Sequence, residues 1–328
     1  MKIHKRTKHA LNNVINCLHR ISYRGTHISN GCISDANIYS RLMQPSIDWS
    51  LCVRHLICPL CGDGFEINGR SLTCSQKHTF DLAKDNYVNL IPGGTKMPKF
   101  PGDSKMMLQA RRRFLDSGHY QPLVNTLLEL IHKFDFDNSD GPETAVLDAG
   151  CGEGYYLNQI QQGLAFDGCY YGVDLSKDAI RMAAKRVGNG RFVVANIKKQ
   201  MPLADSSTHL LLNIFAPRSP TEFARLLCPN GRLLIVIPQD NHLQALRENF
   251  DLLNIQPDKQ ALIEKQFAPY FKLKNRVHFK FPLKLQGGNL FDLVQMMPGQ
   301  RGSQTNAQPL TESQSIETEA NVTIMVFG

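Results

Sequence analysis

The pattern of apolar and polar residues is most regular in the second half of the chain. There, short apolar runs alternate with amphipathic stretches, which indicates strands alternating with helices. The expected strands are Ala145–Leu147, Tyr170–Val173, Arg191–Val194, Leu210–Ile214 and Arg232–Ile237, with helices at Lys177–Val187 and Glu222–Leu227. Alternation at this spacing predicts an α/β fold with a parallel sheet and helices on both faces.

The flanking regions follow other patterns. Ser104–Leu115 and Pro122–Phe134 have helical periodicity, and Ser104 suits an N-cap. Val277–Phe281 and Asn321–Phe327 are expected to form a terminal antiparallel pair of strands. The polar segment Gly299–Ala320 between them is expected to be a mobile loop.

A glycine-rich motif follows the first expected strand. The run Val146-Leu-Asp-Ala-Gly-Cys-Gly-Glu-Gly-Tyr155 places glycines at 150, 152 and 154. Only glycine tolerates both the dihedral angles of such a turn and the close approach of a ligand to its backbone. The acids Asp148 and Glu153 would repel a phosphate but attract a ligand that carries a sulfonium and an ammonium. Tyr155 also stands where a dinucleotide fingerprint needs a glycine, so Gly150 and Gly152 favour S-adenosylmethionine (SAM).

A second acid supports the same ligand. Asp174 ends the next expected strand, and a carboxylate at about this offset from a glycine loop binds ribose hydroxyls. A glycine turn alone can be only a turn, and a strand-end aspartate can be only a helix cap. Together with the alternating strands, the two motifs favour a SAM site.

A cluster of metal-binding residues precedes this region. Cys58, Cys61, Cys74 and His78 follow the pattern C-x2-C-x12-C-x3-H. Two pairs of soft ligands on tight turns can close a tetrahedron around Zn²⁺, and Gly69 suits a hairpin between the pairs. Four protein ligands leave no open position, so the metal would be structural. The alternative is a set of free thiols beside an ordinary surface histidine.

Composition adds weaker constraints. The net charge is +8, but residues 1–50 carry seven Lys and Arg against Asp35 and Asp48, so the rest of the chain is only mildly basic. No run of about 18 apolar residues exists, so no membrane partner is expected. Nine cysteines, an odd number, do not resemble a disulfide framework, and no secretory signal is visible.

The expected location is a reducing cytoplasm. Residues 1–50 are interpreted as a disordered extension or a misassigned start, in preference to a targeting peptide.

Further motifs lie between the cysteine cluster and the glycine loop. They are Phe80-Asp-Leu-Ala-Lys-Asp-Asn-Tyr87, Pro101-Gly-Asp-Ser104, Ala110-Arg-Arg-Arg-Phe-Leu-Asp116 and Gly118-His-Tyr120-Gln-Pro. In this order the chain resembles, over about residues 56–328, the bacterial 23S ribosomal RNA guanine-N1 methyltransferases of the RlmA (RrmA) family. The resemblance implies a Rossmann-like seven-strand SAM-dependent methyltransferase domain preceded by a small zinc-binding domain.

The resemblance also implies site residues and a substrate. The family's zinc ligands correspond to the four cluster residues, and its SAM contacts correspond to Tyr120, Gly152, Glu153 and His242. The implied reaction is methylation of guanine N1 in the hairpin loop of helix 35 of 23S ribosomal RNA, and a homodimer is implied. The alternatives are a SAM-dependent methyltransferase acting on a small molecule or protein, and a non-catalytic zinc-containing RNA-binding protein.

Substrate contacts are less defined. Asn213 and Phe215 follow the fourth expected strand, where ligands bind at the carboxyl ends of a parallel sheet. Asn213 could hydrogen-bond guanine and Phe215 could stack on it, although plain core packing explains Phe215 equally well. A phosphate-binding rim or, alternatively, an exposed helix face is expected from Arg111, Arg112, Arg113, Lys96, Lys99 and Lys105.

The sequence thus predicts four parts. They are an extension (1–50), a zinc-binding RNA-recognition module (51–95), a helical linker (96–140) and a SAM-dependent methyltransferase domain (141–328).

Overall fold

The computed structural model describes residues 49–98, 102–134, 144–164, 168–250, 252, 255, 258–297 and 313–328. By its internal contacts the chain divides into residues 1–46 and 47–328, and the second unit contains all of these residues. The predicted extension therefore lies almost entirely outside the described residues. Trp49 is the informative exception, because it is only 3% exposed and belongs to the hydrophobic core of the second unit. None of the described helices is long and apolar enough to cross a membrane.

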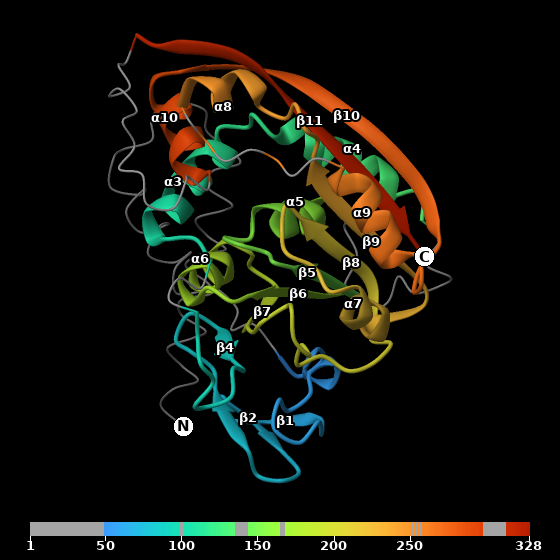
Figure 1. Cartoon of the computed structure of the whole chain (residues 1–328). Coiled ribbons are helices and arrows are strands. Elements are labelled where there is room, and N and C mark those ends of the chain that lie inside the picture. The colour runs from blue at the N-terminus through green and yellow to red at the C-terminus, as the bar shows by residue number, and fades with distance from the viewer. Residues whose placement is uncertain are drawn as a thin grey trace, which may run out of the picture. The chain divides into compact units, whose positions relative to one another are not determined.

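A mixed sheet of eight strands forms the centre of the second unit within the described residues, in the order β10-β11-β9-β8-β5-β6-β7-β4 (Figure 1). The strands are β4 (Tyr87–Asn89), β5 (Ala145–Ala149), β6 (Cys169–Asp174), β7 (Gly190–Val194), β8 (Thr208–Ile214), β9 (Leu227–Pro238), β10 (Leu273–Gln286) and β11 (Ser315–Phe327). β4 to β9 pair in parallel, whereas β11 is antiparallel to both β9 and β10. All five predicted parallel strands are present, and β5 to β11 form the predicted Rossmann-like seven-strand sheet.

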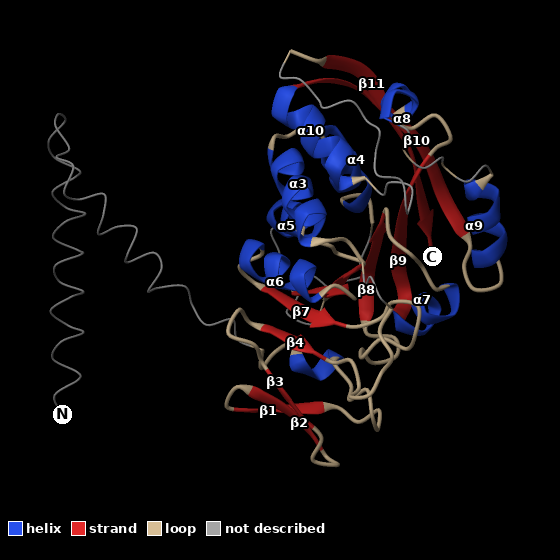
Figure 2. Ribbon diagram, turned by 60° about the vertical axis from the view of Figure 1, so that its left-hand side comes forward, coloured by secondary structure: helices blue, strands red, loops and turns tan. Residues whose placement is uncertain are grey.

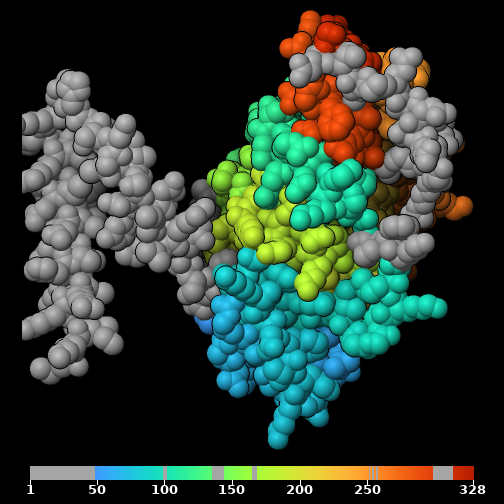
Figure 3. Space-filling view, turned by 90° about the vertical axis from the view of Figure 1, so that its left-hand side faces the viewer, coloured from blue at the N-terminus to red at the C-terminus, as the bar shows by residue number. Residues whose placement is uncertain are grey.

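Helices cover both faces of this sheet (Figure 2). α3 to α6 and α10 lie on one face, and α7 and α9 lie on the other. The helices are α3 (Lys105–Asp116), α4 (Gln121–Ile131), α5 (Tyr155–Leu164), α6 (Lys177–Arg186), α7 (Pro220–Leu226), α8 (Gln244–Phe250), α9 (Lys259–Phe267) and α10 (Gly287–Met296). Figure 3 shows α3 (blue-green) between α6 (yellow-green) and α10 (orange-red), both of which it contacts.

Both faces of the central strands are buried, which explains their continuous apolar runs. In β5, the side chain of Val146 joins one hydrophobic core and that of Leu147 joins the other, as the two-residue period of a strand requires. The Ser104 hydroxyl accepts a hydrogen bond from the Met107 amide, so the predicted N-cap of α3 is confirmed.

The region of the four metal-binding residues forms a small antiparallel sheet of its own. It contains the 3₁₀ helix η1 (Val53–His55) and the strands β1 (Phe65–Asn68), β2 (Ser71–Cys74) and β3 (Thr79–Asp81). Gly69 has a φ of +61° at the turn between β1 and β2, so the predicted hairpin is confirmed. Tyr87–Asn89 then leaves this region and pairs with β7 in the main sheet. The boundaries predicted at residues 95 and 140 stay predictions, but the small module is joined to the main sheet through β4.

A disulfide bond forms a second connection. Cys52 is bonded to Cys169 at the start of β6, 117 residues further along the chain. Nearby, the Tyr171 hydroxyl donates a hydrogen bond to the Cys52 carbonyl and lies 2.8 Å from Nδ1 of His55. The nine cysteines do not predict a disulfide framework, and the bond between Cys52 and Cys169 is a single pair, so distant in the sequence that it leaves no spacing pattern.

The predicted polar loop Gly299–Ala320 is wrong at its C-terminal end. Residues 315–320 belong to β11 and pair with β10. Glu317 and Glu319 alternate with the buried Thr318 and Ala320, and Glu317 forms an ion pair with Lys284 on β10. The polarity that suggested a loop therefore belongs to the solvent face of a half-buried strand. Residues 299–312 lie outside the described residues.

Candidate functional site

The four predicted metal ligands come together at the small antiparallel sheet. The ligand atoms of Cys58, Cys61, Cys74 and His78 all lie within 4.8 Å of one another. Nδ1 of His78 lies 3.5 Å from Sγ of Cys58 and 3.4 Å from Sγ of Cys74. Sγ of Cys61 lies 3.6 Å from Sγ of Cys74.

These distances fit a tetrahedral zinc ion. Zn–S bonds of about 2.3 Å and a Zn–N bond of about 2.0 Å give tetrahedral edges of roughly 3.5–3.8 Å. The measured separations agree with these edges. Cys58, Cys61, Cys74 and His78 can therefore hold a zinc ion, and because protein ligands would take all four positions, that ion would be structural. Cys52, also close in sequence, is in the disulfide and is not a ligand.

The glycine loop connects β5 to α5 in the predicted conformation. The φ angles of Gly150, Gly152 and Gly154 are +89°, +54° and +87°, values that favour glycine. A Cβ atom on Gly150 would lie 2.4 Å from Cβ of Ala216, so this position excludes any side chain. At Gly152 the nearest such atom is Nη1 of Arg111 at 3.9 Å, so the loop is most open at this glycine.

Asp148, the last polar residue of β5 before the loop, is a buried acid. It is 2% exposed, and its Oδ1 has no hydrogen-bond partner among the described residues. The pKa of the Asp148 carboxyl is raised to about 8, mainly by burial and to a lesser extent by the charge of Asp174. A desolvated carboxylate without a cation is costly, and the sulfonium and ammonium groups of SAM would supply the missing positive charge. The donor set at the loop therefore fits SAM.

Asp174 lies at the predicted strand end, against the glycine loop. Its Oδ2 accepts a hydrogen bond of 3.0 Å from the Gly152 amide, and its Oδ1 accepts one of 2.8 Å from the Ser176 amide. Burial is the main cause that raises its pKa, and these two hydrogen bonds oppose the rise. Asp174 thus fixes the loop and the start of α6, and its remaining lone pairs are available for ribose hydroxyls.

Glu153 points toward two arginines. Its Oε2 accepts hydrogen bonds from Nε of Arg112 at 2.9 Å and from Nε of Arg186 at 2.8 Å. Its Oε1 is buried and has no hydrogen-bond partner in the described part of the chain. The carboxylate therefore ties the glycine loop to α3 and α6 with one oxygen, and a SAM contact by Glu153 stays a prediction.

Tyr120 and His242, 122 residues apart in sequence, meet at the carboxyl end of the sheet. The Tyr120 hydroxyl lies 3.4 Å from Nε2 of His242, and both side chains are buried. Nδ1 of His242 lies 3.0 Å from both the amide nitrogen and the carbonyl oxygen of Asn321. Burial, together with the charges of Arg247 and Lys259, lowers the pKa of His242 to about 4. The imidazole is therefore neutral near pH 7.

Phe215 lies beside this pair and is partly exposed. Its ring centroid is 6.0 Å from that of His242 and 6.4 Å from those of Tyr120 and Tyr156. These four residues form an aromatic cluster. Phe215 is 39% exposed and has a φ of +53°, a conformation that costs a bulky residue about 1–3 kcal/mol. Strain of this kind often occurs at functional sites, and the exposed fraction argues against plain core packing.

Asn213 lies at the end of β8 but is fully buried. Its Nδ2 donates hydrogen bonds of 2.9 Å to the Ala149 carbonyl and 2.8 Å to the Pro217 carbonyl. Because both amide hydrogens are used, Asn213 has no donor left for guanine in this conformation. It instead ties the turn that carries Phe215 to the end of β5.

The three arginines of the predicted phosphate-binding rim are each paired with a carboxylate, and their contact with phosphate stays a prediction. Arg111 is paired with Asp103, Arg112 with Glu153 and Arg113 with Asp292. The helix α3 packs against α6 and α10, so these side chains join neighbouring elements. Lys96 and Lys105 are exposed as expected, and Lys99 lies outside the described residues.

The sequence reasoning missed three residues around the aromatic cluster. Tyr156 follows the glycine loop and contributes a ring to the cluster. Arg218 lies just after the Phe215 turn, and Lys259 begins α9. Only Tyr156 had a sequence signal, its position directly after the loop.

Two family models match this chain. The first, described as the N-terminal region of RlmA and named as a zinc ribbon, matches residues 56–99. The second, described as a methyltransferase domain, matches residues 140–275. They coincide with the structural zinc site and with the strands and helices around the glycine loop.

Curated relatives cover most of the chain. A 23S rRNA (guanine(748)-N(1))-methyltransferase of Streptomyces fradiae is 35% identical over 246 residues, 75% of this chain and 85% of the relative. A putative 23S rRNA (guanine-N(1)-)-methyltransferase of Micromonospora griseorubida is 32% identical over 74% of this chain and 86% of the relative. Another with this putative description, from Bacillus subtilis, is 34% identical over 63% of this chain and 71% of the relative.

Proposed function

Because this chain belongs to the family of 23S ribosomal RNA (guanine-N1)-methyltransferases, we propose that it methylates N1 of a guanine in 23S ribosomal RNA with SAM as donor. The finer part of the proposal is that the guanine lies in the hairpin loop of helix 35. N1 of a paired guanine is inside the duplex, so the enzyme needs an unpaired or extruded base. A hairpin loop supplies one, because RNA bases are read best when they are splayed out.

The residues at the glycine loop would hold the donor. Gly152 offers the open side of the loop, Asp148 offers an unpaired carboxylate oxygen, and Asp174 offers acceptors for hydroxyls. SAM, when bound, supplies a methyl group that is already activated by the positive sulfur. The protein therefore mainly has to align donor and acceptor, at about 3–3.5 Å, and to exclude water.

Tyr120 and His242 would close this site. Both are buried, and Tyr120 packs edge-on against Phe114 and Phe281 as well as Phe215. The neutral imidazole of His242 adds no charge that would repel the sulfonium. Their contact with SAM is part of the proposal, and so is the contact of Glu153.

Phe215 is the observation that supports the target site most directly. It is the exposed member of the aromatic cluster, and Asn213 and the turn hold it in a strained conformation. An aromatic ring held in this way provides a stacking surface for an extruded base, and base stacking contributes about 1–3 kcal/mol. We assign Phe215 to stacking on guanine and Asn213 to positioning Phe215.

The proposal also covers the role of the zinc module, the oligomeric state and the location of the protein. The module would contact the RNA hairpin beside the target loop, and its metal would keep its turns folded without taking part in methyl transfer. A homodimer and a cytoplasmic location, where ribosomal RNA is found, belong to the same proposal.

The test is methylation of RNA by the purified chain. A transcript of the helix 35 hairpin is incubated with SAM, and 1-methylguanosine is measured by nucleoside mass spectrometry. A transcript with the target guanine replaced by adenine serves as the RNA control. Transfer to the guanine transcript alone is expected, whereas transfer to a small molecule or protein but to neither RNA would contradict the proposal.

A pair of variants tests the stacking role. Phe215→Leu keeps an apolar side chain but removes the aromatic face, so kcat/KM for RNA should fall on the order of tenfold or more. Phe291→Leu changes an exposed phenylalanine on α10 and should have little effect. The affinity for SAM, measured by calorimetry, should stay within about twofold in both variants. Equal kcat/KM values in the two variants would show that Phe215 does not stack on the base.

A further inference from the structure

Arg218 is a partly buried cation at the end of the Phe215 turn. Its Nη2 donates a hydrogen bond of 3.0 Å to the Ala216 carbonyl, and its Nε lies 3.4 Å from Oδ1 of Asn213. No ion pair joins it to a carboxylate of the described residues, in contrast to Arg111, Arg112 and Arg113. Burial lowers its pKa, and no acid opposes this effect. Since a buried charge without a counter-charge is costly, the surroundings of Arg218 favour an anion.

Lys259 is a second such cation. It is partly buried at the start of α9 and lines a cavity of about 320 Å³. Burial and then the charge of Arg218 lower its pKa, so the two cations lie close enough to repel each other. Asp240 and Asp258 also line the cavity, but neither carboxylate is among the charges that shift the pKa of Lys259 or of Arg218.

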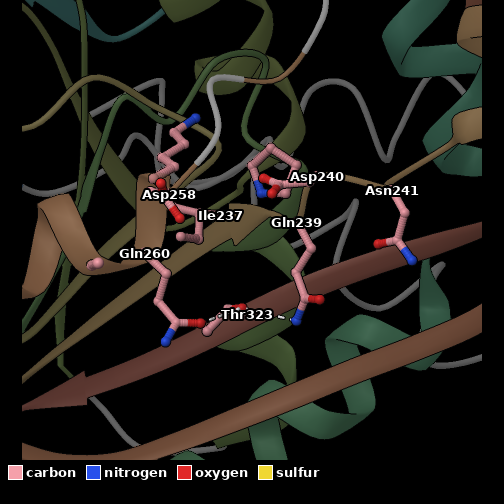
Figure 4. Close-up of a pocket in the computed structure, with 10 residues that line it drawn as sticks. Ile237, Gln239, Asp240, Asn241, Asp258, Gln260 and Thr323 are labelled. Atoms are coloured by element: carbon pink, nitrogen blue, oxygen red, sulfur yellow. Dashed lines mark hydrogen bonds between the residues drawn. The ribbon is translucent and has the colours of Figure 1, made fainter.

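Neutral polar side chains make up another part of the cavity lining. Gln239 and Gln260 point toward Thr323 from two sides (Figure 4). Nε2 of Gln239 lies 3.0 Å from Oγ1 of Thr323, which in turn lies 3.4 Å from Oε1 of Gln260. These side chains satisfy one another. Lys259 and Arg218, here called the cationic pair, are the cations at this place that form no ion pair with a described carboxylate.

The cationic pair lies next to the aromatic cluster. Arg218 is three residues after Phe215 on the same turn, and Asn213 contacts this turn at Pro217 and at Arg218. The charge of Lys259 contributes to the low pKa of His242, whose ring lies 6.0 Å from that of Phe215. The pair therefore sits at the carboxyl ends of β8 and β9, where a substrate is expected in this fold.

We propose that Arg218 and Lys259 hold an RNA backbone phosphate adjacent to the target guanosine while Phe215 stacks on its base. The inference rests on the proposed function, since it assigns the phosphate to that same substrate. A base that leaves the helix carries its flanking phosphates with it. A guanidinium binds phosphate oxygens through two parallel hydrogen bonds, and a lysine adds a point charge. The same pair could hold the carboxylate of SAM, and the experiment separates these two anions.

Lysine and arginine variants form the first arm of the experiment. Lys259→Gln and Arg218→Gln should each raise KM for the hairpin RNA about tenfold and reduce the salt dependence of RNA binding by about one unit of slope. The Kd for SAM, measured by calorimetry, should stay within about twofold. Lys265→Gln, an exposed lysine on the same helix α9, is the matched control and should change neither value.

Synthetic RNA forms the second arm. The phosphates on the 5′ and 3′ sides of the target guanosine are replaced, one at a time, by a neutral methylphosphonate. One of the two replacements should raise KM for the wild-type protein about tenfold. The same replacement should raise KM little further for Lys259→Gln, because this variant has already lost its contact with the phosphate. If Arg218→Gln does not fold, Lys259→Gln and the methylphosphonate RNAs decide the matter.

Each outcome has one meaning. If the wild type methylates the hairpin and all three variants have its KM for RNA, the assignment of a phosphate site is wrong and the proposed function stands. If SAM affinity falls about tenfold in Lys259→Gln while KM for RNA does not change, the anion is the carboxylate of SAM and the inference is overturned. If the wild type transfers no methyl group to RNA, the proposed function fails first.

Discussion

The zinc site and the SAM site differ in how far apart in sequence their residues lie. The zinc ligands lie between Cys58 and His78 on neighbouring turns of one small sheet. The proposed SAM site combines a glycine loop on consecutive residues with Tyr120 and His242, which meet beside Phe215 only after the large sheet has formed. Spacing alone therefore identifies the whole zinc site, but only the glycine loop and Asp174 of the SAM site.

The largest effect should follow from breaking the local site. Cys61→Ser removes a ligand from a site whose apparent zinc binding free energy is typically about 10–16 kcal/mol. We expect loss of zinc by elemental analysis and a fall in RNA methylation on the order of 100-fold or more, with the Kd for SAM changed only severalfold. Cys228→Ser, a free cysteine outside the cluster, is the control. Full activity in a zinc-free variant would show that the two sites are independent.

The second largest effect should come from substitution of Asp174. Asp174→Ala removes the carboxylate that accepts from the Gly152 and Ser176 amides, so the Kd for SAM should rise on the order of 100-fold. Asp174→Asn keeps one acceptor and should give an intermediate loss. Asp178→Ala, an exposed acid in the first turn of α6, is the matched control. Calorimetry that shows an unchanged affinity in Asp174→Ala would refute the assignment.

A smaller effect should appear as pH dependence. The pKa of Asp148 is about 8 in the free protein, so its carboxyl holds a proton at pH 7. A positive ligand favours the ionised form of this carboxyl, so SAM binding should release a proton. The affinity for SAM should therefore rise with pH, by up to about tenfold per pH unit, until pH reaches about 8, and should then level off. Calorimetry in buffers of different ionisation enthalpy measures this proton. Asp148→Asn should abolish the pH dependence, and its persistence would assign the proton to another group.

The smallest effect should come from the N-terminus. Deletion of residues 1–46, the first unit, should leave turnover unchanged. Deletion of residues 1–50 also removes Trp49, which is 3% exposed, so the melting temperature should fall by several degrees. Thermal unfolding of the two truncated proteins measures the difference. A large loss of activity in the shorter deletion would give residues 1–46 a function.

The sequence predicts most of the sheet because buried parallel strands have continuous apolar runs and alternate with helices. It did not predict β4, since Tyr87–Asn89 is too short to show a pattern. Part of β11 resembled a loop because Glu317 and Glu319 supply its polar face. Asn213 and Phe215 were placed at the correct strand end, but the use of both Asn213 amide hydrogens could not be predicted from the sequence.

Charged residues were the least predictable. Arg111, Arg112 and Arg113 resemble an exposed basic patch, but each is paired with a carboxylate at least eight residues away in sequence. Arg218 and Lys259 have no such partner among the described residues, and this difference appears only when burial and distance are known. Charge counts along a sequence therefore do not distinguish an RNA-binding cation from one that joins two helices.

The pairing of β4 with β7 has a consequence for synthesis of the protein. Tyr87–Asn89 leaves the ribosome about 100 residues before its partner, Phe192–Val194, and synthesis proceeds at about 5–20 residues per second. The zinc-bound turns form locally and can fold early. Apart from the bridge between Val88 and Leu82, the edge strand that follows them lacks its sheet partner β7 for several seconds. During that interval the nascent chain exposes an unpaired strand, and the metal-bound module has to remain soluble until the sheet reaches it.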